Sequence, residues 1–134
     1  MADKQRRFRE GVARNPPFLA ETVELLAALA PRYRMAVVSS SFRSEILPAI
    51  ERAGLLPLFV TVITGDDARN LKPAPDLYLL AVERLGTRNA LVIEDSDAGV
   101  AAGLAAGLEV LRVPAVEQVA AVVRARLGLL PNAT

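Results

Sequence analysis

The sequence contains no cysteine, no histidine and no tryptophan. Without cysteine there is no disulfide bond, thiol nucleophile or thiolate zinc site, and without histidine the commonest general base and transition-metal ligand is absent. Aromatic residues make up only 4% of the chain, which argues against the base-stacking surfaces of nucleic-acid-binding proteins. Any chemistry must therefore use carboxylates, lysine, serine or threonine, an inventory that suits Mg²⁺ and phosphate.

The net charge is also close to zero, because 16 Lys and Arg residues are balanced by 15 Asp and Glu residues and leave a formal charge of +1. This balance indicates no broad basic surface for nucleic acid. No apolar run is long enough to span a membrane, and no secretory signal follows the basic N-terminus. We therefore expect a cytoplasmic protein with neither a nucleic-acid nor a membrane partner.

The domain organisation follows from length and composition. The chain has 134 residues, of which 52% are hydrophobic, enough for a single core. Residues 17–134 are expected to form one domain, and residues 1–16 a basic helix or tail.

Short apolar runs alternate with helical patterns along this domain. Strands are predicted at 35–38, 59–63, 90–93 and 109–113, and amphipathic patterns at 19–30, 46–54, 77–85, 98–106 and 116–127. Pro48 lies inside the second pattern, so that helix is expected to start late or to kink. The alternation predicts parallel βαβ crossovers and hence an α/β fold, a three-layer Rossmann-like parallel sheet with helices on both faces.

Polar clusters follow three of the predicted strands, at 39–41, 64–67 and 94–97. In a parallel α/β sheet the ligand crevice lies outside the carboxyl ends of the strands, so these clusters and the loop residue Lys72 should share one rim. Hydroxyls and backbone N–H groups can hold phosphate oxygens, an ammonium can neutralise them, and paired carboxylates can hold Mg²⁺. The sequence therefore predicts a phosphoryl site.

Simpler interpretations exist for each group. Serines after a strand often make turns or helix caps, and Lys72 also fits a solvated loop. Two acids before a helix are often caps. Asp97 is expected to cap the helix that starts at Ala98, whereas Asp66 and Asp67 are expected to be turn residues.

Four sequence strings resemble the haloacid dehalogenase superfamily in content, order and spacing, and in particular its β-phosphoglucomutase and phosphoglycolate phosphatase-like branch. They are VVSSSFR (37–43), TGDD (64–67), LKPAPDLYLLAVERLG (71–86) and VIEDSDAGVAAGLAAG (92–107). The resemblance implies a haloacid dehalogenase-like core. It also implies a Mg²⁺-dependent phosphatase or phosphomutase acting on a small phosphorylated metabolite.

The resemblance also implies roles for individual residues. Ser39 would bind the transferring phosphoryl group, with help from the backbone of Ser40, and Lys72 would bind the same oxygens. Arg43 would contact the substrate.

The implied metal ligand is Asp95, with Glu94 as a second ligand or a neighbour of the metal shell. The family reaction begins with attack by an aspartate at the end of an N-terminal strand, and a second aspartate two residues later acts as general acid and base. The segment before Pro16 contains a single aspartate, Asp3, and no strand-like apolar run, so no nucleophile is identified.

The expected core is therefore incomplete at its N-terminal strand, and the chain is expected to be inactive on its own. The family's cap domain is also missing, unless residues 4–13 are its remnant. The alternative is a non-catalytic domain that binds phosphate and Mg²⁺, or serves in assembly.

The missing strand would lie between the strand that ends at Ser39 and the strand that ends at Ile93. Each buried N–H or C=O left unpaired there costs roughly 1 to 3 kcal/mol. Either residues 37–38 pair directly with residues 91–92, giving one four-stranded sheet, or another chain supplies a strand or an edge. We favour the second arrangement, as a homo-oligomer or with a complementing chain.

Overall fold

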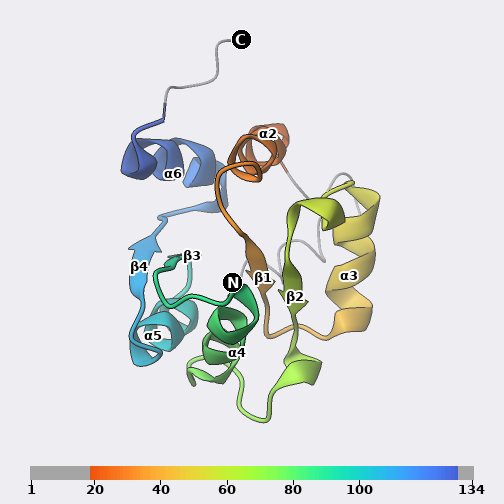
Figure 1. Ribbon diagram of the computed structural model, residues 1–134, viewed down its shortest axis with the longest axis vertical. Coiled ribbons are helices and arrows are strands. Elements are labelled where there is room, and N and C mark those ends of the chain that lie inside the picture. Colours follow the sequence, from red (N-terminus) through yellow and green to blue (C-terminus); the bar gives the residue numbers. More distant parts are fainter. Residues whose placement is uncertain (1–18, 130–134) are drawn as a thin grey trace.

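The computed structural model describes residues 19–129, in which strands and helices alternate along the chain (Figure 1). The helices are α2 (Ala20–Leu29), α3 (Arg43–Arg52), α4 (Asp76–Leu85), α5 (Asp97–Ala105) and α6 (Val119–Leu127). The strands are β1 (Ala36–Val38), β2 (Thr61–Ile63), β3 (Leu91–Glu94) and β4 (Glu109–Arg112), and 3₁₀ turns occur at Leu56–Leu58, Gly65–Asp67 (η2) and Val116–Gln118. The predictions for residues 1–16 lie outside the described residues.

The four strands form two parallel pairs rather than one continuous sheet. β1 pairs with β2, with Val37 opposite Val62, and β3 pairs with β4, with Ile93 opposite Leu111. Within residues 19–129 no backbone hydrogen bond joins β1 to β3. The direct pairing of residues 37–38 with residues 91–92 is therefore not formed. Each pair keeps its own helix instead, since α4 packs mainly on β1 and β2 and α5 on β3 and β4.

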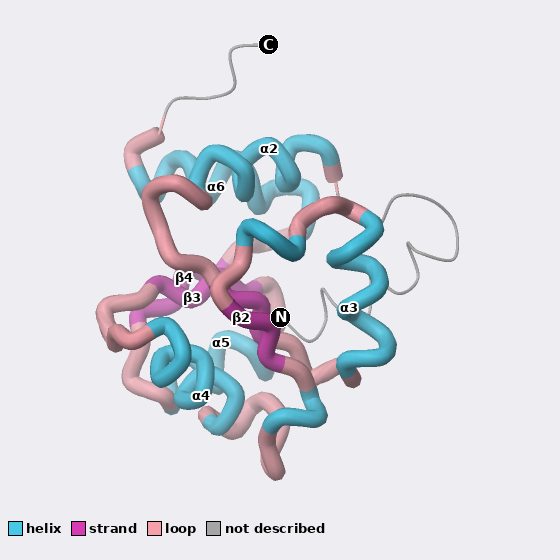
Figure 2. The backbone as a smooth tube through the Cα atoms, turned by 45° about the vertical axis from the view of Figure 1, so that its right-hand side comes forward, coloured by secondary structure: helices cyan, strands magenta, loops and turns pink. Residues whose placement is uncertain are grey.

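Alternating strand residues supply the two faces of the strand layer. Val37 and Val62 point into a cluster with α3, whereas Val38 and Ile63 point the opposite way, into a cluster with α4 and α5. A third cluster joins α2 to α6 and includes Ile93. Figure 2 shows α4 and α5 below the strands and α2 and α6 above them. The predicted three-layer α/β architecture is thus confirmed.

Small residues let α5 lie close to its strands. A Cβ at Gly103 would come within 2.7 Å of Val110 Cγ2 and 3.3 Å of Val92 Cγ1. Ala102 and Ala106 are buried on the same side of the helix. This close approach positions the end of β3 and the loop that follows it, where the predicted metal ligands Glu94 and Asp95 lie.

α3 begins at Arg43 and continues through Pro48, so the late start is excluded and the kink at Pro48 stays a prediction. Another local prediction needs correction. The N-cap of α5 is Ser96 rather than Asp97, because the Ser96 hydroxyl accepts a hydrogen bond from the Gly99 N–H at 3.0 Å. Asp97 is the first residue of the helix and pairs with Arg112 at 2.8 Å.

Candidate functional site

The carboxyl ends of the first three strands carry polar side chains that are withdrawn from solvent. Ser39 after β1, Thr64 after β2 and Glu94 at the end of β3 are each 0% exposed. Polar groups at this depth need partners, because an unpaired buried donor or acceptor costs about 1 to 3 kcal/mol. Their partners define the site.

Lys72 connects the two strand pairs. Its Nζ lies 2.6 Å from Glu94 Oε2 and donates to the Val38 carbonyl at 3.0 Å, and both side chains of the Lys72–Glu94 pair are fully buried. Ser39 N–H bonds to Ile63 of β2, so the carbonyl of Val38, one residue earlier, points away from β2. The ammonium therefore lies between the end of β1 and the end of β3.

Tyr78 of α4 completes this cluster. Its hydroxyl donates to Glu94 Oε2 at 2.5 Å, the same oxygen that Lys72 contacts, and its ring centroid lies 5.0 Å from Lys72 Nζ. Burial raises the pKa of the Tyr78 hydroxyl far above its ordinary value. The phenol therefore stays protonated near neutral pH and acts as a donor to the carboxylate.

Gly99 makes room for the Glu94 carboxylate. A Cβ at this position would lie 2.1 Å from Glu94 Cδ and 2.2 and 2.5 Å from its two oxygens, closer than any side chain could approach. The glycine of the EDSDAG string is thus explained by steric constraint, because a larger residue would collide with Glu94 in this fold. Glu94 is held between α4, α5 and Lys72.

The serine loop after β1 is ordered by its own hydroxyls. Ser39 Oγ accepts from the Ser41 N–H at 2.9 Å, and Ser40 Oγ lies 3.4 Å from the Lys72 N–H. Ser39 therefore makes the turn contact that the simpler interpretation expected. Its hydroxyl proton can still be donated, and the Ser40 hydroxyl joins this loop to the lysine loop.

Arg43 contacts the end of β2 in this structure. Its guanidinium donates to the Val62 carbonyl at 2.9 Å and lies 3.7 Å from Asp67, while its backbone N–H donates to Asp66 Oδ1 at 2.6 Å. This backbone hydrogen bond, above all, lowers the pKa of the Asp66 carboxyl, although desolvation opposes the change. Asp66 and Asp67 are turn residues, as predicted, since they lie in η2 and bond to Thr64.

Glu94 and Asp95 are adjacent at the end of β3, and the two carboxylate oxygens of Asp95 are shielded from solvent. Carboxylate oxygens are the donors that Mg²⁺ prefers, commonly one or two of them together with water and phosphate. The donor type therefore fits the predicted ion. In residues 19–129 no group of three or more acidic side chains could hold a metal, so the described carboxylates fit part of a Mg²⁺ shell.

Sequence reasoning missed Tyr78 and Gly99. The signal for Tyr78 was available, because Tyr78, Ala81, Val82 and Leu85 follow the spacing of one helix face, and a tyrosine there must bury its hydroxyl beside a partner. Which partner it finds depends on how α4 packs against β3, and sequence alone does not define that packing.

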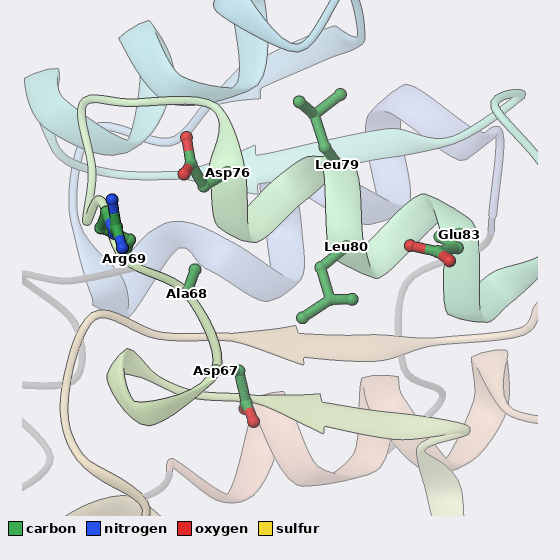
Figure 3. Close-up of a pocket in the computed structure, with 7 residues that line it drawn as sticks. All are labelled: Asp67, Ala68, Arg69, Asp76, Leu79, Leu80 and Glu83. Atoms are coloured by element: carbon green, nitrogen blue, oxygen red, sulfur yellow. The ribbon is translucent and has the colours of Figure 1, made fainter.

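A separate shallow pocket of about 420 Å³ lies between the loop after β2 and α4. Figure 3 shows its lining: Asp67, Ala68, Arg69, Asp76, Leu79, Leu80 and Glu83. Neither Ser39 nor Lys72 lines it, so the predicted phosphoryl site is a different feature of the molecule. In the described part of the chain, no helix is long and apolar enough to cross a bilayer.

Comparison with known proteins is consistent with this geometry. A model of the haloacid dehalogenase-like hydrolase family matches residues 3–107. The chain is 35% identical over 109 residues to a phosphorylated carbohydrates phosphatase of Thermotoga maritima, across 80% of this chain and 49% of the relative.

Two solved structures superpose well on this fold. CbbY from Rhodobacter sphaeroides, in complex with xylulose-(1,5)bisphosphate, is 28% identical with a TM-score of 0.70, and the match covers 83% of this chain and 52% of that one. A hydrolase from Streptococcus pneumoniae, 24% identical with a TM-score of 0.72, covers 83% and 57% and shares the fold. The chain thus spans about half the length of these relatives.

Proposed function

Because the chain belongs to the haloacid dehalogenase-like hydrolase family, we propose that it carries the phosphoryl-binding site of a Mg²⁺-dependent phosphatase or phosphomutase that acts on a small phosphorylated sugar. The observation that carries the proposal is the position of Lys72, whose ammonium is buried between the ends of β1 and β3 beside the serine loop. A buried ammonium at this rim offers a strong electrostatic partner for a phosphoryl group.

Each side chain of the proposed site has a distinct role toward the phosphorylated substrate. Ser39 and the backbone of Ser40 hold phosphoryl oxygens, and Lys72 neutralises their charge. Arg43, at the rim and 44% exposed, reaches the remainder of the substrate. Its hydrogen bond to the Val62 carbonyl also gives Arg43 a structural role at the end of β2.

Asp95 and Glu94 are the residues that would hold Mg²⁺, and the fit of their oxygen donors supports this assignment. When bound, the ion would neutralise charge on the phosphoryl group. The Glu94 carboxylate would then contact both the ion and Lys72.

We also propose that the 134-residue chain binds phosphate without turnover. Within residues 19–129 the acidic side chains in the polar clusters after β1 and β3 are Glu94, Asp95 and Asp97. The first two are the proposed metal ligands, and Asp97 pairs with Arg112. A cytoplasmic location stays a prediction of the sequence alone.

Calorimetric titration with inorganic phosphate, with and without Mg²⁺, tests the site. Lys72→Met should weaken phosphate binding at least about tenfold, the loss expected for a hydrogen bond to a charged group. Arg69→Gln removes an exposed cation from the same loop and should leave binding unchanged. Equal affinity in the wild type and the folded Lys72→Met variant would overturn the proposal.

One observation favours an assembly role as the second candidate. Within residues 19–129 the edges of β1 and β3 that face each other are not joined by backbone hydrogen bonds, and such edges pair readily with a strand of another chain. A second copy or a complementing chain would then supply the strand. Sedimentation velocity over a wide concentration range tests the homo-oligomer: a monomer throughout would exclude it.

A further inference from the structure

Tyr78 and Lys72 hold Glu94 through one and the same oxygen. The Tyr78 hydroxyl lies 2.5 Å and Lys72 Nζ 2.6 Å from Glu94 Oε2. Lys72 and Glu94 have fully buried side chains, and Tyr78 is 5% exposed. Water therefore does not compete with these contacts, and a charge-assisted hydrogen bond in such surroundings is strong.

The position of the carboxylate leaves little freedom. Gly99 lies against it so closely that a single added carbon would collide with Cδ. A divalent cation that takes Oε2 of Glu94 must therefore compete with the two donors already bound to that oxygen, because the carboxylate cannot shift toward α5. The phenol is a neutral donor, so it holds Glu94 without cancelling its charge.

From this geometry, and resting on the proposed function, we propose that Tyr78 is a positioning residue that holds Glu94 Oε2 away from a bound cation, so that cation binding through this oxygen requires the Tyr78–Glu94 hydrogen bond to loosen. Tyr78 thereby lowers the divalent-cation affinity of the site. Tyr78 also reports whether Glu94 binds a cation, because its hydroxyl loses the hydrogen bond to Glu94 when the cation takes that oxygen.

The composition of the chain allows Tyr78 to be followed by its fluorescence. There is no tryptophan, and the only tyrosines are Tyr33 and Tyr78. Tyr33 is 46% exposed, and it is not among the residues assigned to the site. A Tyr33→Phe protein therefore emits from Tyr78 alone, and a phenol hydrogen-bonded to a carboxylate is quenched relative to one that is released.

The first measurement follows Tyr78 emission in the Tyr33→Phe protein as MgCl₂ is added, in parallel with calorimetry. Emission should rise to a plateau, and its midpoint should fall at the cation concentration that half-saturates the calorimetric binding. Binding by calorimetry with no change in emission would overturn the inference while leaving the metal site intact.

The second measurement compares Mg²⁺ affinity in the wild type, Tyr78→Phe and the matched Tyr33→Phe control. Tyr78→Phe keeps the ring beside Lys72 and removes only the hydroxyl, so the affinity should rise about three- to tenfold, whereas Tyr33→Phe should not change it. A purely structural role would lower the thermal midpoint of Tyr78→Phe without tightening binding. Unchanged or weaker binding in Tyr78→Phe would refute the inference alone, and no binding in any of the three proteins would refute both it and the proposed metal site.

Discussion

Gly99 of α5 lies against the carboxylate of Glu94 at the end of β3, and a Cβ on Gly99 would sit 2.1 Å from Glu94 Cδ. The glycine therefore serves a side chain rather than a turn. It lets a fully buried glutamate reach Lys72 and Tyr78.

Gly99→Ala should consequently be among the most destabilising single-carbon additions in this fold. The added methyl must push Glu94 off Lys72, and breaking a buried ion pair costs about 3 to 5 kcal/mol. Urea denaturation measures the loss. Gly103→Ala is the matched control, because its Cβ would meet apolar valine side chains, Val110 Cγ2 at 2.7 Å and Val92 Cγ1 at 3.3 Å, rather than a charged group. A larger loss at Gly103 than at Gly99 would contradict the prediction.

The Lys72–Glu94 pair should behave as one energetic unit. Lys72→Met or Glu94→Gln alone leaves the other charge buried, so each should lower the free energy of unfolding by about 3 to 5 kcal/mol. The double variant should lose much less than the sum of the two. A double-mutant cycle from denaturation curves gives the coupling free energy, and strictly additive losses would show that the pair does not interact as the 2.6 Å separation implies.

Ser39→Ala should have both a structural and a binding effect. The hydroxyl is fully buried and accepts from the Ser41 N–H at 2.9 Å, so its removal should cost about 0.5 to 1.5 kcal/mol. Phosphate affinity should fall at the same time. Ser44→Ala, on the exposed side of α3, should stay within about 0.5 kcal/mol and bind normally. Loss of stability without loss of affinity would leave Ser39 with its turn role only.

Asp66 should contribute stability in a pH-dependent way. The Arg43 backbone N–H lowers the pKa of Asp66 below its ordinary value of 3.8. A carboxyl whose pKa is depressed on folding stabilises the native state above that ordinary value, and this contribution disappears as the pH falls through the lower, folded pKa. Asp66→Asn should therefore be less stable than the wild type near neutral pH and equal to it in strong acid. Chemical denaturation at a series of pH values, with exposed Glu51→Gln as the control, provides the comparison; a difference independent of pH would count against this role.

The sequence was sufficient for the parts of this fold that follow from periodicity and from strand ends. The short apolar run at 35–38 predicted a strand with helices on both faces, and Val37 and Val38 do lie in opposite clusters. The carboxyl-end rule brought Lys72 to the rim with Glu94. Family membership, inferred from four strings, was confirmed by the match over residues 3–107.

Side-chain partners were harder to predict than positions. Asp97 and Ser96 are both good capping residues, and only the backbone geometry shows that Ser96 reaches the Gly99 N–H. The shared oxygen of Glu94 depends on how α4 and α5 meet across the strands, a tertiary distance that no local pattern encodes. The separation of β1 from β3 depends on packing in the same way.

That separation also affects how the molecule fluctuates. Because no backbone ladder within residues 19–129 crosses from β1 to β3, side chains hold the two halves together: the apolar cluster under α4 and α5, the cluster that joins α2 to α6, and the bridge through Lys72. The halves can part along this seam without breaking a backbone hydrogen bond of either pair, so amide protons inside the ladders should exchange much more slowly than those along the seam. The protein would then have two cooperative units, and the site would lie at their hinge.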